Sequence, residues 1–427
     1  MSTLRAVKGM NDVLPGEIAR WQRVERAFRD VADRYGYGEV RTPIVEPTAL
    51  FVRSIGETTD IVEKEMYTFT DKGEDSLTLR PEGTASAVRA FVEHSVAARE
   101  PVSKWYYLGP MFRRERPARG RYRQFWQAGC EVYGDPGPFV DAEMIDMVVG
   151  LLEGLGVKDL EVLVNSLGSG STRDRYRVAL QDYLRPHEDK LSEDSKRRLH
   201  ANPLRVLDSK AAVDQEICAE APTILEHLSD EDAAHFADLR AGLDALGTPY
   251  RVAPRLVRGL DYYTRTLFEV QGRGGQLGAQ NALCGGGRYD DLVEQIGGPR
   301  TPAIGFAMGL ERILLVLEES PPPPVVEAFV AVTDPALRTQ ASLLLKDLRK
   351  AGVRADADLR GQSLKSQMRR GDKLGARVTL ILGPAEVERG VVQLKDLARH
   401  AQSEVALADA PARVAALLRE SAIRESA

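Results

Sequence analysis

Two apolar, β-prone segments on either side of an arginine-rich loop constrain the fold more than any other feature. The segments are KWYYLGPMF, residues 104–112, and FWQAGCEVYG, residues 125–134. Aromatic and β-branched residues favour strands on a pleated sheet. Two such segments joined by a polar stretch predict a β-hairpin with the arginine loop at its tip.

The loop itself, RRERPARGRYRQF at residues 113–125, carries six arginines against one acidic residue, Glu115. Most basic runs are solvated surface loops. The chain as a whole has a net charge of -5, so this local excess of positive charge stands out. An arginine can hold phosphate through two hydrogen bonds, and several arginines can share a polyphosphate. With Phe125 as a flat face for a base, the loop indicates a nucleotide site.

Composition restricts the class of protein. Of the 427 residues, 43% are hydrophobic and 28% are charged, as in ordinary globular proteins. No apolar run approaches the roughly 20 residues that a membrane span needs, and the N-terminus lacks an apolar signal core. The three cysteines are far apart, which favours a reducing compartment and argues against a structural zinc site. We therefore expect a cytoplasmic protein that does not contact membranes.

The hydrophobic spacing predicts an α+β catalytic domain with an insertion. Residues 21–35 have helical spacing and stop at Gly36, and EVRTPIVEP at 39–47 predicts one strand, bent or at an edge because of Pro43. Residues 172–250 are almost wholly helical and charged. Strands are expected on both sides, at LEVLVNSLG and TLFEVQG, so this stretch reads as a helical insertion. We interpret His227 and His235 as surface residues of a helix.

A second domain follows a proline-rich segment. SPPPP at 320–324 predicts a stiff linker. Beyond it, strand and helix patterns alternate, which is typical of a small α/β domain. We place the catalytic domain at 1–325, interrupted by the insertion at 172–250, and the C-terminal domain at 326–427. GRGGQLG, at 272–278, looks superficially like a dinucleotide-binding loop but lacks the following helix, so we expect a hairpin turn.

Three segments together resemble, in order, the signature motifs of class II aminoacyl-tRNA synthetases. They are GYGEVRTPIV at 36–45, the stretch from Phe112 through the arginine loop to Phe125, and GFAMGLERI at 305–313. LVRGLDYYTRTLFEV at 256–270 and ALCGGGRYDDL at 282–292 resemble the two motifs peculiar to histidyl-tRNA synthetases. TLRPEGTASAVRA at 78–90 is similar to that family's amino-acid-binding loop. The resemblance covers nearly the whole chain and is weakest in the insertion.

The resemblance implies a histidine–tRNA ligase. Such an enzyme joins histidine to ATP, releases pyrophosphate, and transfers the histidyl group to the 3′ end of tRNA(His). The implied fold is an antiparallel sheet flanked by helices, an insertion that embraces the acceptor stem, and a C-terminal α/β domain that reads the anticodon. The first motif implies a homodimer. Mg²⁺ is expected to accompany ATP through its phosphates, and no metal ligands are expected among the side chains.

The resemblance also assigns the ATP contacts. Arg113 would hold the α-phosphate and Arg121 the γ-phosphate, while Phe125 and Arg312 clasp the adenine. Glu115 would accept a hydrogen bond from the adenine amino group. Arginine suits both tasks because it binds phosphate with two prongs and stacks on flat rings.

Arg258 has a separate part. It would reach the α-phosphate where other class II enzymes tend to use a metal ion. Two anions must meet in adenylation, so the protein's task is positioning and charge neutralisation. We therefore expect Arg113 and Arg258 to be the catalytic residues.

Histidine offers three groups to recognise. Its ammonium group fits Glu82 and Thr84, and its carboxylate fits Gln127 and Arg258. Its imidazole nitrogens fit a carboxylate, Glu131, and a phenol, Tyr263, and glycines 285–287 would let the backbone approach the ring. Tyr289 is expected to line the same pocket. The full expected set is Glu82, Thr84, Arg113, Gln127, Glu131, Arg258, Tyr262 and Tyr263.

Two alternatives stay open at this point. Paralogues of the same family act as regulatory subunits of ATP phosphoribosyltransferase, but these typically lack the C-terminal domain and have eroded ATP motifs. A synthetase for proline or threonine is the other alternative, and GLDYY and CGGGRYD argue against it. Between residues 354 and 377, seven basic residues face three acidic ones, which favours an RNA contact in the C-terminal domain.

Overall fold

The computed structural model describes residues 3–56, 59–272, 281–318 and 325–425. The chain divides into two compact units, residues 1–319 and 320–427. The predicted linker SPPPP lies outside the described residues, and so does the predicted hairpin turn GRGGQLG apart from Gly272. In the part of the chain that the structure describes, none of the helices is both long and apolar enough to cross a membrane.

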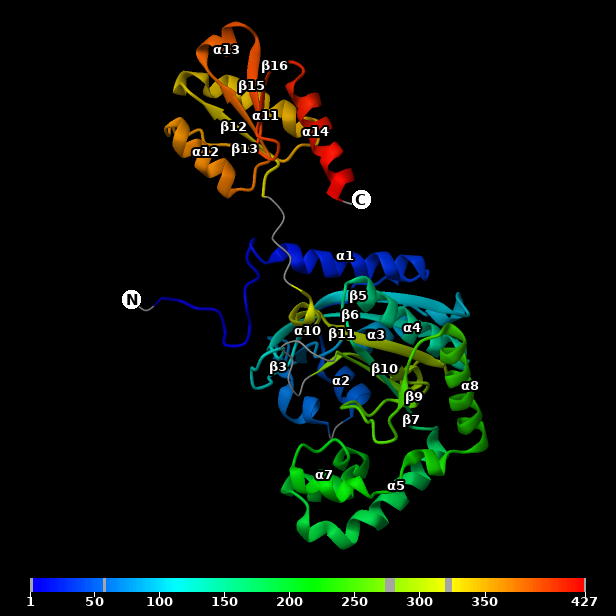
Figure 1. Cartoon of the computed structure of the whole chain (residues 1–427). Helices are drawn as coiled ribbons and strands as arrows, with labels where there is room; N and C mark the ends of the chain where they lie inside the picture. The colour runs from blue at the N-terminus through cyan, green and yellow to red at the C-terminus, as the bar shows by residue number, and fades with distance from the viewer. Residues whose placement is uncertain (1–2, 57–58, 273–280, 319–324, 426–427) are drawn as a thin grey trace. The chain divides into compact units, whose positions relative to one another are not determined.

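An eight-stranded sheet forms the centre of the first unit (Figure 1), in the order β1-β5-β6-β11-β10-β9-β7-β8. The central strands pair antiparallel, and only the edge pairs β1–β5 and β7–β8 are parallel. The strands are β1 (Gly38–Glu39), β5 (Ser103–Phe112), β6 (Gln124–Tyr133), β7 (Leu160–Ser166), β8 (Arg251–Val252), β9 (Thr264–Gly272), β10 (Ala282–Arg288) and β11 (Ala303–Gly309). The predicted arginine hairpin is the β5–β6 pair, in register from Ser103↔Tyr133 to Phe112↔Gln124.

Helices cover both faces of this sheet because their apolar residues fall on one side. In α1 (Ile18–Arg34) the residues at helical spacing, Val24, Phe28 and Val31, are buried, and the chain turns at Gly36 as expected. The other helices of the unit outside the insertion are α2 (Thr48–Ile55), α3 (Thr84–Glu93), α4 (Pro138–Gly154), α9 (Leu292–Gln295) and α10 (Leu310–Val316). One large core joins α1, α4 and α10 to the sheet.

The strand predicted at 39–47 is two strands in two different sheets. The first piece, β1, pairs with β5 at the edge of the large sheet, and β2 (Val45–Pro47) belongs to a small sheet of order β2-β4-β3. The other strands of that sheet are β3 (Tyr67–Thr70) and β4 (Ser76–Leu79). Pro43 lies in the break, and it has no N–H to donate to a ladder. The prediction of a single strand was therefore wrong, but the expected edge position is confirmed, since β1 and β2 each lie at the edge of a sheet.

The segment between β7 and β8 is helical, with helices α5 (Gly170–Leu184), α6 (Glu193–Ala201), α7 (Ala212–Ala219) and α8 (Asp230–Leu246). Figure 1 shows α5 and α7 away from the sheet and α8 beside α4. Phe236, Leu239 and Leu243 of α8 are buried in the large core. The last helix of this segment therefore packs on the core of the first unit.

One helical histidine was misplaced by the sequence analysis. His227 is half-buried at the end of a short 3-10 helix, but His235 of α8 is buried, not on the surface. It faces the buried Arg288–Asp141 ion pair, whose Nη2–Oδ1 distance is 2.8 Å, and its Nε2 lies 3.8 Å from Asp141. Burial, with Arg288 nearby, lowers the pKa of His235 to about 4.

The C-terminal unit is a five-stranded sheet of order β13-β12-β14-β15-β16 with helices packed on it. Its elements are β12 (Ala328–Val332), α11 (Arg338–Lys350), β13 (Ala355–Ala357), α12 (Leu364–Lys373), β14 (Val378–Leu382), α13 (Pro384–Glu388), β15 (Val391–Asp396), β16 (Ala401–Ala406) and α14 (Ala410–Glu425). The first three strands of that order are parallel and the rest antiparallel, so the expected α/β pattern is confirmed.

The basic stretch of this unit is partly neutralised. Arg354, Arg360 and Arg370 form ion pairs with neighbouring acids at 3.2, 2.6 and 3.4 Å. Two of these acids, Asp356 and Asp358, already belong to the count along the sequence, so only the pair with Glu327 lowers the local excess of positive charge below that count.

Candidate active site

A polar cavity opens on the face of the large sheet, over strands β6, β10 and β11. It brings together residues that are far apart in the chain, from the loop before α3 to the start of α10. Every site residue that the sequence predicted lines it, except one. The lining members are Glu82, Thr84, Arg113, Glu115, Arg121, Phe125, Gln127, Arg258, Tyr262, Tyr263 and Arg312. The exception is Glu131, which is fully buried and bonded to two of the lining side chains.

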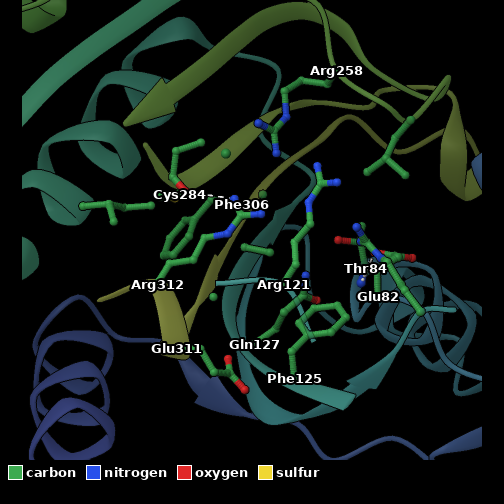
Figure 2. A pocket seen from close by; sticks show the side chains of 18 of the residues that line it. Glu82, Thr84, Arg121, Phe125, Gln127, Arg258, Cys284, Phe306, Glu311 and Arg312 are labelled. Carbon is green, nitrogen blue, oxygen red and sulfur yellow. Dashed lines mark hydrogen bonds between the residues drawn. The ribbon is translucent and has the colours of Figure 1, made fainter. Parts of the chain in front are cut away.

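Three guanidinium groups converge on the cavity (Figure 2). Arg121 comes from the hairpin loop, Arg258 from the segment before β9, and Arg312 from α10. Arg312 is held by the carbonyls of Gly120, at 3.2 Å, and Ala282, at 3.0 Å. Burial, and then the nearby Arg121 and Arg258, lower the pKa of Arg312. Such crowding of like charges is unfavourable unless an anion shares them, so this part of the cavity suits a polyphosphate.

The hairpin loop supplies a second layer of contacts here. Arg121 pairs with Glu115 at 3.1 Å, and Arg113 lies 4.0 Å from the same carboxylate. Arg113 also donates to the Pro81 carbonyl, at 2.9 Å, and its guanidinium lies 5.3 Å from the centre of the Phe125 ring. These contacts keep the arginines of the loop directed at the cavity.

Glu311 was noted only as part of a motif, and its contacts show what it does. Both of its carboxylate oxygens accept from the backbone N–H of Trp126, at 3.0 and 3.1 Å. Burial raises the pKa of Glu311 to about 7. The contact fixes the start of α10 against β6, which also places the neighbouring Arg312.

The opposite end of the cavity is acidic, aromatic and closed. Glu82 accepts backbone N–H bonds from Thr84 and Ala85, both at 2.7 Å, so the carboxylate holds the first turn of α3. Burial raises the pKa of Glu82, while these N–H bonds act to lower it.

Glu131 of β6 lies at the centre of this end. It accepts hydrogen bonds from the hydroxyls of Thr84, at 2.7 Å, and Tyr289, at 2.5 Å. Burial raises the pKa of Glu131 to about 8. Gly305 is its cross-strand neighbour on β11, and a Cβ there would overlap the carboxylate. The sequence paired Glu131 with Tyr263 around the imidazole, whereas the phenol that contacts it in the structure is Tyr289.

Tyrosine rings and an amide complete this end. The rings of Tyr262 and Tyr263 lie 4.7 Å apart, and those of Tyr262 and Tyr289 lie 5.6 Å apart in an edge-on arrangement. Burial raises the pKa of Tyr263 to about 12, while Arg258 acts to lower it, so the phenol keeps its proton. The Oε1 of Gln127 is buried and, within the described residues, has no hydrogen-bond partner. Such a group requires a partner and suits a polar ligand.

Arg258 lies between the two ends, and its contacts were missed by sequence reasoning. Its guanidinium forms an ion pair with Glu269 of β9. Its main-chain carbonyl accepts from Arg205, at 3.1 Å, so the helical segment between β7 and β8 also holds this residue. Glu269 stands in the predicted strand TLFEVQG, where a charged residue between apolar ones was a usable signal. Arg205 carried no such signal, because nothing local relates it to Arg258.

The glycines 285–287 accommodate protein atoms. A Cβ at Gly285 would overlap the guanidinium of Arg258, and one at Gly286 the carbonyl of Gly305. At Gly287 it would lie 2.5 Å from the Thr266 carbonyl and 2.9 Å from the Tyr263 ring. The sequence analysis explained these glycines by a close approach to the imidazole, and that explanation is incomplete. Atoms of the sheet and of the cavity walls already occupy the space that their side chains would take.

Comparison with known proteins decides the family. The family model described as histidyl-tRNA synthetase matches residues 9–313, and the model described as anticodon binding domain matches residues 327–417. The chain belongs to the histidyl-tRNA synthetase family. It is 58% identical over 404 residues to a histidine–tRNA ligase of Sorangium cellulosum, with 95% of this chain and 94% of the relative covered. It is 49% identical to that of Geobacter metallireducens, covering 95% and 97%.

Solved structures agree with this assignment. The structure of apo histidyl-tRNA synthetase from S. aureus superposes with a TM-score of 0.82 at 36% identity, covering 97% of this chain and all of that one. These similarities confirm the predicted α+β fold and the prediction of a histidine–tRNA ligase, an aminoacyl-tRNA ligase. A Bacillus halodurans protein described as an ATP phosphoribosyltransferase regulatory subunit/histidyl-tRNA synthetase shares the fold, at 22% identity and a TM-score of 0.65. The regulatory-subunit alternative is not favoured.

Proposed function

We propose that this member of the histidyl-tRNA synthetase family activates L-histidine with ATP and transfers the histidyl group to the 3′ end of tRNA(His). The observation that carries this proposal is the division of the cavity. Arginine side chains suited to the phosphates and the base of ATP lie beside a closed end of buried carboxylates and phenols suited to a small cationic amino acid.

In the first step, a carboxylate oxygen of histidine attacks the α-phosphorus of ATP. The new bond is a mixed anhydride, the bond from the α-phosphorus to the bridging oxygen breaks, and pyrophosphate leaves with that electron pair. Negative charge grows on the α-phosphate oxygens, and we assign its stabilisation to Arg113 and Arg258. Arg121 takes the γ-phosphate, while Phe125 and Arg312 hold the adenine with Glu115 at its amino group.

At the closed end, we assign the ammonium group to Glu82 and Thr84, and the carboxylate to Gln127, Arg113 and Arg258. Glu131 and Tyr263 recognise the imidazole nitrogens, with Tyr262 and Tyr289 as walls. Glu131 already accepts from Thr84 and Tyr289, and its two oxygens have further lone pairs with which to accept from the ligand. A site built to hydrogen-bond both nitrogens discriminates against side chains that lack them.

Mg²⁺ enters this proposal only as the companion of ATP. The described residues contain no group of three or more His, Cys, Asp or Glu side chains that could hold a metal ion. Phosphate oxygens and water usually supply most Mg²⁺ ligands. The ion neutralises phosphate charge when bound, and the side chains position the reacting groups.

In the second step, the terminal 3′-ribose hydroxyl of the tRNA attacks the histidyl carbonyl, and AMP leaves. We assign the catalytic domain to residues 1–325 with the insertion at 172–250, which contacts the acceptor stem. The domain at 326–427 reads the anticodon. We also propose a cytoplasmic homodimer, since Ile44 and Val45 of the first class II motif are exposed on this chain.

The activity is tested by ATP–pyrophosphate exchange in the presence of each of the twenty amino acids. We expect exchange with histidine alone. Exchange that depends on proline or threonine, or no exchange with any amino acid from a folded preparation, contradicts the proposal.

The anticodon assignment needs a second test. Removing residues 326–427 should leave much of the histidine-dependent exchange, provided that the oligomeric state is kept, and sharply reduce tRNA charging. It should also flatten the salt dependence of tRNA binding, because phosphate contacts dominate that dependence. A truncated protein of unchanged oligomeric state that charges tRNA at the intact rate would defeat the assignment.

A further inference from the structure

The guanidinium of Arg258 lies in a seat formed by two neighbouring strands. Its Nη1 pairs with Oε2 of Glu269 on β9. Glu269 lies directly across from Gly285 of β10 in the register of the sheet, and a Cβ at Gly285 would overlap the guanidinium. The missing side chain therefore leaves the space, and the carboxylate beside it sets the direction in which the guanidinium points.

Glu269 is itself held in place. Its other oxygen, Oε1, accepts from Nε2 of Gln271 at 2.7 Å, and Oε1 of Gln271 accepts from Nδ2 of Asn281 at 2.8 Å. The side chain of Glu269 is only 14% exposed. Because each carboxylate oxygen has a donor, the carboxylate has little freedom to rotate.

We propose that Glu269 is a positioning residue for Arg258. It holds the guanidinium where charge develops on the α-phosphate, and it forms no bond to the substrate. An arginine has five N–H donors, so a contact through Nη1 leaves the others for phosphate. The inference rests on the proposed function, because it gives Arg258 the adenylation role.

A plain structural reading competes with this one. A half-buried arginine is stabilised by a counter-charge, and Glu269 would then affect folding without affecting the reaction. The positioning role and the structural role predict different rates of adenylation per folded, competent site. Misplacing a reacting group by about 1 Å can slow a reaction by about 10²-fold, whereas a purely structural pair changes only the number of competent sites.

The test is a double-mutant cycle with R258A, E269Q and the double variant. The rate of adenylate formation is measured in single turnovers, with competent sites counted from the burst. We expect E269Q to slow the step by about 10²-fold, with smaller changes in the KM values of ATP and histidine. The double variant should be no slower than R258A, because a positioning residue has nothing left to position.

Two further variants keep the test decisive. E161Q breaks the pair between Glu161 and Arg251, 2.8 Å apart on β7 and β8 of the same sheet, and should leave the rate unchanged. E269D should recover part of the lost rate, since it keeps the charge.

If E269Q does not fold, Q271A loosens Glu269 without removing the ion pair. It should slow adenylation by a few fold, and only when Arg258 is present. Losses that multiply in the double variant, or a wild-type rate per competent site in E269Q, overturn the inference. Absence of histidine-dependent exchange in the unmodified protein would instead overturn the proposed function.

Discussion

The two ends of the cavity differ in how their charges are held. At the closed end, which we assign to the amino acid and call the amino-acid end, Glu82 and Glu131 are almost fully buried, and both oxygens of each accept a hydrogen bond. At the end lined by the hairpin loop, which we assign to ATP and call the nucleotide end, Glu115 and Arg121 form an ion pair with side chains 16% and 32% exposed. A buried polar group left without its partner is destabilising by roughly 1–3 kcal/mol, while a partly exposed ion pair contributes about 1 kcal/mol or less.

The difference in burial between the two ends indicates which part of the site can rearrange when a ligand binds. Contacts of the hairpin loop can be exchanged for contacts with phosphate at low energy, because water already competes for them. The amino-acid end has no such freedom, so its shape and its donors are set before the ligand arrives. We infer that selectivity for the amino acid comes from this closed end, and that the nucleotide end adapts to ATP.

Arg258 lies where the two ends meet, so its loss should have the largest effect. We expect R258A to reduce the turnover of adenylation by roughly 10²-fold or more, since it removes a stabiliser of transition-state charge. Transfer from preformed adenylate should suffer less, because the α-phosphorus has already been attacked. Single-turnover assays separate the two steps, and equal losses in both would argue against this division.

The closed end is tested by E131Q, which keeps the shape of the side chain but cannot form a carboxylate when histidine binds. The loss of a charged hydrogen bond in a buried site is worth roughly 1.5–3 kcal/mol, or about 10- to 150-fold in the KM for histidine. The KM for ATP should change little. An unchanged KM for histidine would show that Glu131 does not recognise the ligand.

The same residue predicts a pH dependence of stability. The pKa of Glu131 is raised from an ordinary 4.5 to about 8 in the folded protein. Between these values the folded state keeps a proton that the unfolded state has released, so the contribution of Glu131 to the free energy of unfolding falls as pH rises. Thermal unfolding at pH 6 and pH 8.5 should show a larger drop in Tm for the unmodified protein than for E131Q. An equal drop in Tm for both proteins would mean that burial does not raise the pKa of Glu131.

The smallest effect is expected at the nucleotide end. E115Q weakens both the partly exposed pair with Arg121 and the contact that we assign to the adenine amino group, and such solvated contacts are worth about 0.2–1 kcal/mol. The KM for ATP should therefore change by less than about five-fold. The KM for histidine is the control and should stay constant. If E115Q impairs activation more than E131Q does, the two ends do not differ as described here.

The local sequence was enough to predict those site residues that lie close together along one strand or loop. The arginine hairpin and Phe125 could be predicted from adjacent residues, whereas Arg312 was placed in the same site by the resemblance of its motif to the family. All site residues predicted from the sequence line the cavity except Glu131, which is buried behind it and bonded to the lining residue Thr84. The break at Pro43 was missed because the residues on either side belong to different sheets, and sheet order is not a local property.

The contacts that escaped prediction depend on how the elements pack. Glu269 pairs with Arg258 beside Gly285, which the register of β9 and β10 places across from Glu269, and Arg205 contacts Arg258 from the helical segment. His235 is buried because α8 packs on α4. It lies at helical spacing from Leu239, on the same buried face as Phe236, so the periodicity carried a signal for its burial that the sequence analysis did not use.

The glycine run 285–287, with Gly305 on the next strand, has a consequence for how this chain can vary. At each of these positions any other amino acid introduces a carbon atom into space that a guanidinium, a carboxylate, a carbonyl or a ring already fills. Most active-site residues can be replaced by some similar side chain with a graded loss. No side chain is similar to that of glycine, so even the smallest substitution, to alanine, causes a steric clash. This strand can therefore change only if the groups packed against it change as well.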